Sequence, residues 1–146
     1  MSRALPSRVK KGRIKETQAK KESMKILIVE DEEALSRVLK EKFETEGFEA
    51  TIVDNGADAA PTAVKFKPDV VVLDLILPKK DGFAVLAEMK ADAELKSVPI
   101  VVLSNLGEDE NIKRAISLGA ADYFVKTQHP INEIIEKVKE QMTKGI

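Results

Sequence analysis

The 146-residue chain contains no cysteine, no tryptophan and a single histidine. Without cysteine it has no disulfides and no thiolate metal sites, and the lone His129 excludes a histidine-rich metal centre. Hard oxygen ligands are therefore the only plausible metal donors. No apolar run is long enough to cross a bilayer, so a membrane partner is not expected. The length fits one domain with a real core.

Charge is distributed unevenly along the chain. Residues 1–23 carry eight basic and two acidic side chains, a balance of +6, whereas the whole chain has a net charge of −1. The remainder, residues 24–146, therefore carries about −7, which makes it a poor candidate for binding nucleic acid. We predict a basic, disordered arm over 1–23 and one folded domain over 24–146. The arm is interpreted as a solvated tail; an electrostatic contact and an over-extended start of the reading frame are the alternatives.

Five short apolar runs alternate with stretches of helical periodicity. The runs are continuous, which is typical of parallel strands covered on both faces. Right-handed crossovers then predict a doubly wound α/β sheet with five helices and strand order 2-1-3-4-5. Pro61 predicts that the second helix, within 57–66, is short, late-starting or kinked. The predicted strands are 26–29, 51–53, 70–73, 100–103 and 123–125, and the helices after them end near Gly47, Phe66, Lys90, Gly119 and Gly145.

Ionisable or hydroxyl side chains directly follow four of the predicted strands. In a doubly wound sheet the ligand site lies beyond the carboxyl ends of the strands, here between the first and third strands. Because neighbouring strands lie ~4.8 Å apart, Asp31 and Asp74 are expected to be neighbours, with Ser104 beside Asp74. Lys126 follows a strand further along the sheet, and its long side chain can reach the other residues from there. The side chains predicted to meet are Glu30, Asp31, Asp74, Ser104 and Lys126.

The predicted cluster suits the chemistry of phosphate. Three carboxylates in one crevice repel one another, and a divalent cation resolves the repulsion; oxygen ligands favour Mg²⁺ over zinc. A metal and the Lys126 ammonium would neutralise phosphoryl oxygens, and Asp74 would act as the nucleophile and form an acyl phosphate. Asp74 taken alone is equally well explained as a cap for the following helix.

These residues together resemble the receiver domain of two-component response regulators. The resemblance covers about residues 24–144 and implies a flavodoxin-like fold. Each motif is weak alone, but all of them in order at the right strand ends are specific. The matching positions are the acidic pair Glu30-Asp31, the phosphoacceptor Asp74, Pro78 and Asp81-Gly82 after it, the switch residues Ser104 and Tyr123, and Lys126.

The resemblance also implies roles for these positions. Mg²⁺ would be bound by Asp31, Asp74 and the backbone carbonyl of Ile76, with Glu30 acting mostly through water. A histidine kinase or a phosphotransfer protein would supply the phosphoryl group. After phosphorylation, Ser104 would bond the new oxygens and Tyr123 would rotate inward. Read without the family, Ser104 could simply end a strand and Tyr123 could be a core aromatic.

The expected function is that of a stand-alone signalling module in the cytoplasm, not an enzyme acting on a separate substrate. The fourth helix, fifth strand and fifth helix would present the surface that changes for a downstream partner, and a homodimer is possible. No output domain, such as a DNA-binding domain, is expected, because the sequence ends where the fifth helix ends.

Two other functions remain open from the sequence. A degenerate receiver would bind partners without phosphate, which the intact acidic pair and lysine disfavour. A phosphatase with an aspartyl nucleophile would need a second carboxylate two residues after Asp74, where Ile76 stands. Both Ile76 and Leu106 are apolar, at positions where polar side chains can orient a hydrolytic water. The sequence therefore predicts a long-lived acyl phosphate.

Overall fold

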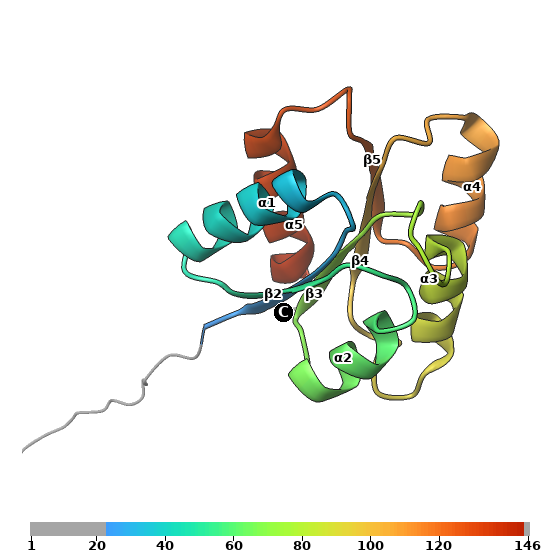
Figure 1. The fold of residues 1–146 in the computed structure, drawn as a ribbon, viewed down its shortest axis with the longest axis horizontal. Coiled ribbons are helices and arrows are strands. Elements are labelled where there is room, and N and C mark those ends of the chain that lie inside the picture. The colour runs from blue at the N-terminus through green and yellow to red at the C-terminus, as the bar shows by residue number, and fades with distance from the viewer. Residues whose placement is uncertain (1–22, 145–146) are drawn as a thin grey trace, which may run out of the picture.

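The computed structural model describes residues 23–144, which form a five-stranded parallel sheet in the order β2-β1-β3-β4-β5 with five helices around it (Figure 1). The predicted doubly wound fold is confirmed. The predicted arm over 1–23 lies almost wholly outside the described residues. The strands are β1 (Lys25–Val29), β2 (Glu49–Val53), β3 (Val70–Leu73), β4 (Ile100–Ser104) and β5 (Asp122–Val125), and the helices are α1 (Glu33–Thr45), α2 (Ala59–Phe66), α3 (Gly82–Ala91), α4 (Asp109–Ser117) and α5 (Ile131–Lys144).

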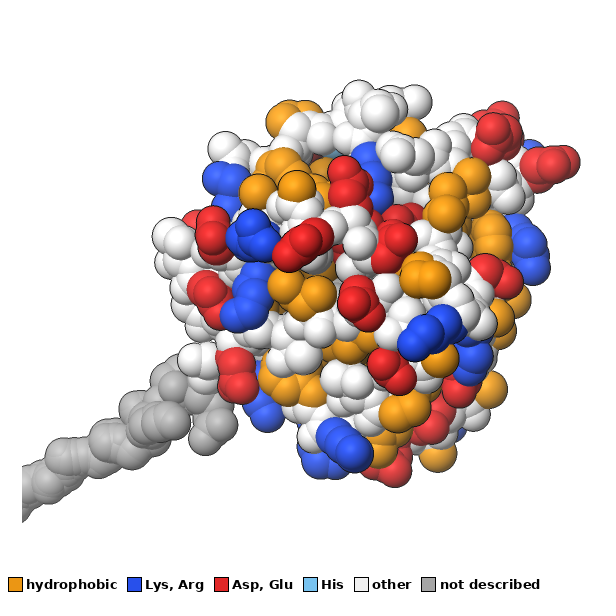
Figure 2. All heavy atoms as spheres, viewed as in Figure 1, with side chains coloured by type: hydrophobic (Ala, Val, Ile, Leu, Met, Phe, Trp, Pro, Cys, Tyr) orange, Lys and Arg blue, Asp and Glu red, His pale blue; other side chains and the backbone are white. Residues whose placement is uncertain are grey.

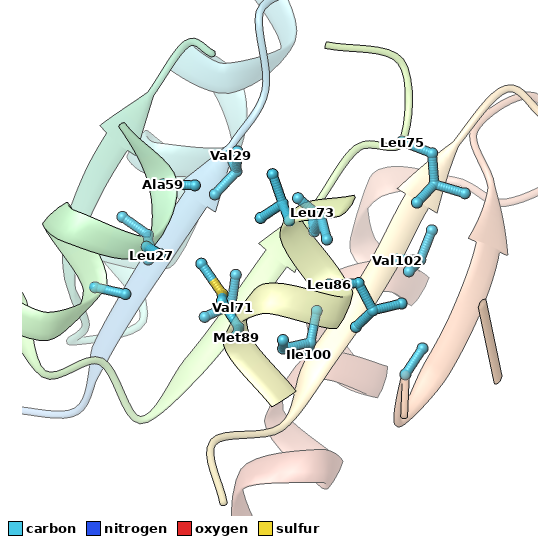
Figure 3. Close-up of a cluster of buried hydrophobic side chains, with 14 of the residues drawn as sticks. Leu27, Val29, Ala59, Val71, Leu73, Leu75, Leu86, Met89, Ile100 and Val102 are labelled. Atoms are coloured by element: carbon cyan, nitrogen blue, oxygen red, sulfur yellow. The ribbon is translucent and has the colours of Figure 1, made fainter. Parts of the chain in front are cut away.

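Each strand contributes side chains to two cores, because successive residues of a strand point to opposite faces of the sheet. In β1, Ile26 and Ile28 pack with α1 and α5, whereas Leu27 and Val29 pack with α2 and α3. Figure 1 shows the helices in these two layers, and Figure 3 shows the second core, where Leu86 and other α3 side chains pack against the sheet. Burial on both faces explains why the strands are continuous apolar runs.

The second helix starts late, as Pro61 predicted. Helix α2 begins at Ala59, so Pro61 is its third residue. The first turn of a helix has no intrahelical acceptors for its N–H groups, and proline there loses no hydrogen bond. Strand β2 begins at Glu49, two residues before the predicted start, because the two extra residues continue the pairing with β1. Over residues 23–144, no helix has the length and apolar character needed to span a membrane.

Candidate functional site

The carboxyl edge of the sheet brings together three acidic side chains. Strands β1 and β3 pair in register from Ile26 with Val70 to Val29 with Leu73, so the residues after them start side by side. Carboxylate oxygens of Glu30, Asp31 and Asp74 lie within 4.8 Å of one another. Glu30 and Asp74 are buried, while Asp31 is exposed. In Figure 2, acidic side chains gather over the region where Figure 1 places the ends of β1 and β3.

Lys126 supplies the positive charge at this cluster. It follows β5, and its Nζ lies 2.9 Å from Glu30 Oε1 and 3.0 Å from Asp74 Oδ2. Burial alone would lower the pKa of Lys126, but its hydrogen bonds to Glu30 and Asp74 outweigh burial and raise that pKa. The ammonium therefore stays charged at neutral pH and directly contacts the carboxylate predicted to be the nucleophile.

Glu32 is a site residue that the sequence analysis missed. Its Oε1 lies 3.5 Å from Lys126 Nζ, and its backbone N–H donates to Glu30 Oε2 at 2.9 Å. The residue precedes α1 and makes no side-chain cap of that helix, so its carboxylate is available to the lysine. Its sequence signal was only membership of an acidic run, which does not distinguish it from Glu33, whose carboxylate pairs with Arg37 instead.

The pKa of Glu30 shows that the charges in this site are not balanced. Burial and, to a smaller extent, the negative charge of Asp74 raise this pKa to about 7, although hydrogen bonds from Lys126 and the Glu32 backbone act to lower it. One lysine thus does not fully compensate the buried carboxylates. A bound divalent cation would do so, and the carboxylate oxygens are the donors that Mg²⁺ prefers.

The raised pKa of Glu30 predicts a specific pH dependence of stability. Folded Glu30 keeps its proton up to about pH 7, whereas in the unfolded chain it ionises near its ordinary value of 4.5. Its contribution is therefore fully present below about pH 4.5 and is lost as the pH rises through 7. We expect this loss to reach at most about 3 kcal/mol in metal-free protein.

The measurement is urea unfolding in chelator between pH 4.5 and 8. The difference in unfolding free energy between wild type and Glu30→Gln should change across that window. Glu41→Gln, on the exposed side of α1, is the matched control and should follow the wild type. Parallel pH profiles for wild type and Glu30→Gln would contradict the prediction.

The loop after β3 closes tightly around Asp74. The Asp74 backbone N–H donates to Val29 O at 2.9 Å, and the Ile76 N–H donates to Asp74 Oδ1 at 3.2 Å. Asp81 caps α3 by accepting from Ala84 N. A Cβ on Gly82 would lie 2.3 Å from Asp74 O, so only glycine permits this close approach. Asp81 and Gly82 thus shape the loop.

The predicted switch residues Ser104 and Tyr123 meet through the backbone of Leu106. The Leu106 N–H donates to the fully buried Ser104 Oγ at 3.4 Å, and the Tyr123 hydroxyl donates to Leu106 O. Burial raises the pKa of Tyr123, with the charges of Glu108 and Asp74 adding to it, so the hydroxyl keeps its proton. Tyr123 already contacts the β4–α4 loop. Backbone contacts of Leu106 do not depend on its side chain, so the sequence offered no signal for them.

Comparison with known proteins shows the family to which this fold belongs. The model of the response regulator receiver domain family matches residues 26–139. The chain belongs to the response regulator receiver family. Its relatives include the transcriptional regulatory protein SrrA of Staphylococcus aureus, 38% identical over 117 residues, which are 80% of this chain and 47% of that protein. This receiver chain spans about half the length of the curated relatives it matches.

Solved receivers share the fold. The Mn²⁺-bound form of the response regulator Rcp1 is 31% identical, with a TM-score of 0.69 over 80% of this chain and 90% of that one. The phosphorylated cyanobacterial phytochrome response regulator RcpA is 33% identical, with a TM-score of 0.71 over 82% of this chain and 91% of that one. Relatives of this receiver thus include one with a divalent cation and one that is phosphorylated.

Proposed function

We propose that this receiver accepts a phosphoryl group on Asp74 from the phosphohistidine of a histidine kinase or a phosphotransfer protein. The observation that carries the proposal is the Asp74 carboxylate itself. It is buried beside Glu30 and Asp31, and it is bonded by the Lys126 ammonium at 3.0 Å. A buried carboxylate that contacts a lysine ammonium and belongs to an acidic cluster able to hold a divalent cation is arranged for attack on phosphorus.

In the proposed reaction an Asp74 oxygen attacks phosphorus. The O–P bond forms as the bond from phosphorus to the imidazole nitrogen of the donor breaks, and the imidazole leaves with the electron pair. The Lys126 ammonium neutralises charge on the phosphoryl oxygens. Asp31, Asp74 and the Ile76 carbonyl would hold Mg²⁺, with Glu30 acting through water, and the ion would neutralise phosphoryl oxygens. The product is an aspartyl phosphate on this chain, so no separate substrate is turned over.

Phosphorylation would change the conformation of the protein through Ser104 and Tyr123. Ser104 Oγ accepts the Leu106 N–H, so its own proton remains to be donated to a phosphoryl oxygen. Moving Ser104 displaces the Leu106 carbonyl that Tyr123 bonds. Helix α4 is weakly anchored, with Ala115 its one fully buried side chain among the described residues. The surface of α4, β5 and α5 would change with the state of the site and bind a downstream partner or a second copy in the cytoplasm.

Phosphorylation by acetyl phosphate in Mg²⁺ tests the proposal. One phosphoryl group per chain, removed by hydroxylamine and mapped to the peptide that contains Asp74, is the expected result. No labelling with partner binding intact would favour a degenerate receiver. Continuous release of phosphate from an aryl phosphate would favour a phosphatase. Either outcome would overturn the proposed function.

The acyl phosphate is expected to last minutes or longer at room temperature. Ile76 is 55% exposed beside Asp74, and Leu106 lies on the opposite loop, so neither side chain next to the phosphoryl group can orient an attacking water. Replacing Ile76 with asparagine should shorten the lifetime several-fold, since an amide can bond that water. The decay of labelled protein measures it, and Ile116→Asn on α4 is the matched control. A wild-type half-life of seconds would contradict the prediction.

A further inference from the structure

The turn between β2 and α2 packs directly against the loop after β3 that surrounds Asp74. The Gly56 N–H donates to Pro78 O at 3.1 Å. A Cβ on Gly56 would lie 1.8 Å from Lys80 O and 2.7 Å from Lys80 C, both backbone atoms. Real Cβ atoms essentially never come within 3.0 Å of heavy atoms outside their own residue and its two chain neighbours, so any side chain here would displace Lys80 by more than 1 Å. Gly56 is therefore required for this contact between two loops.

The loop held by Gly56 is in a strained conformation. Lys79 has a φ of +73°, and the Lys80 N–H donates to Pro78 O at 2.9 Å, so residues 78–80 form a γ-turn around a non-glycine residue with positive φ. Such a conformation persists only when its surroundings impose it. Pro78 O accepts hydrogen bonds from both Lys80 and Gly56, which places the strained turn and the contact at one atom.

The turn that carries Gly56 is itself fixed. The buried Asn55 side chain donates to Asp54 Oδ1 and Asp58 Oδ2, both at 3.0 Å, and accepts from the Asp58 N–H. On the other side of the contact, Lys80 Nζ pairs with Glu88 of α3 at 2.7 Å. The β3–α3 loop is thus held between a rigid turn and a helix.

We propose that Gly56 is a positioning residue for the cation site, acting through the γ-turn at Lys79 on the loop that carries Asp74 and Ile76. The inference rests on the proposed function, in which the Asp74 carboxylate and the Ile76 carbonyl bind Mg²⁺. Pro78 is two residues from Ile76, so a displacement of the γ-turn passes to a proposed metal donor. Distances between a metal ion and its donors tolerate changes of only about 0.2 Å. Mutation of residues that hold the donors in place typically lowers the affinity for the metal about 10- to 100-fold.

Gly56→Ala is the decisive variant. We expect Mg²⁺ affinity, measured by calorimetric titration, to fall about tenfold, while the labelling rate at saturating Mg²⁺ stays within about threefold of wild type. In metal-free protein the amide signal of Ile76, which donates to Asp74 Oδ1, should shift. Adding Lys79→Gly should restore part of the affinity, because glycine lets the loop find another path around the methyl group.

Gly107→Ala is the matched control, since a Cβ there would meet Val125 at an ordinary 3.6 Å. Urea unfolding of each variant shows that it is folded. If Gly56→Ala does not fold, Asn55→Ala replaces it, with an expected loss of about threefold in affinity.

A folded variant with wild-type affinity and an unshifted Ile76 signal overturns the inference. A wild-type protein that binds no Mg²⁺ overturns the proposed cofactor, whereas the metal-free Ile76 signal decides separately whether Gly56 positions the loop.

Discussion

Asp74→Asn is expected to reduce labelling by acetyl phosphate to background. The amide is not a nucleophile toward phosphorus, and the neighbouring Asp31 is already committed to the cation in the proposed site. The fold should survive, because the amide oxygen can still accept the Lys126 hydrogen bond of 3.0 Å. Removing the Asp74 charge also removes one of the causes that raise the pKa of Glu30, so that pKa should fall.

The control for this experiment is Asp81→Asn on the same loop. Asp81 caps α3 through Ala84 N, and asparagine caps a helix about as well as aspartate. Asp81→Asn should therefore label like wild type. Labelling is followed by mass spectrometry of the intact chain, and folding by circular dichroism. Stoichiometric labelling of Asp74→Asn would show that the phosphoacceptor is another residue.

Lys126→Met is expected to lower both the free energy of unfolding and the rate of phosphorylation. Without the ammonium, Glu30 and Asp74 remain buried with no cation beside them, which costs about 3–5 kcal/mol for a broken buried pair. The loss should be largest above pH 7 in chelator, where Glu30 ionises, and smaller near pH 5, where it holds its proton. Millimolar Mg²⁺ should restore part of it.

The same substitution removes the positive charge that would neutralise the phosphoryl group. We expect the rate of labelling to fall about a hundredfold, in the range found when one charge-stabilising group is removed. Lys113→Met, on the exposed surface of α4, is the control for a lost lysine charge. Urea unfolding and the time course of labelling measure the two effects. If Lys126→Met matched Lys113→Met in both measurements, the role proposed for Lys126 would be wrong.

Four of the predicted site residues, Glu30, Asp31, Asp74 and Lys126, lie together in space because of a simple regularity. Glu30, Asp74, Ser104 and Lys126 each lie at or just after the end of a parallel strand, and parallel strands end at one edge. The order of strands was also predictable, since continuous apolar runs and right-handed crossovers leave few alternatives. The exact partners were not predictable. Nothing in the sequence separates Glu32, which contacts Lys126, from Glu33, which does not.

The backbone contacts were equally inaccessible from the sequence. Leu106 links Ser104 to Tyr123 through its own N–H and carbonyl, and any residue other than proline there would offer the same groups. Gly56 is another case, because only the structure places the Lys80 carbonyl against it. Such contacts depend on how two loops, each remote in sequence, are packed together.

The doubly wound sheet and the residue types at its carboxyl edge were predictable from the amino-acid sequence, because both follow from local apolar periodicity and from where each strand ends. Which of these charges are buried depends on the folded structure, in which the pKa of Glu30 is raised, mainly by burial, to about 7 while Lys126 remains protonated. Desolvation and close approach depend on neighbours from other strands and loops, and no linear pattern contains the distances to those neighbours.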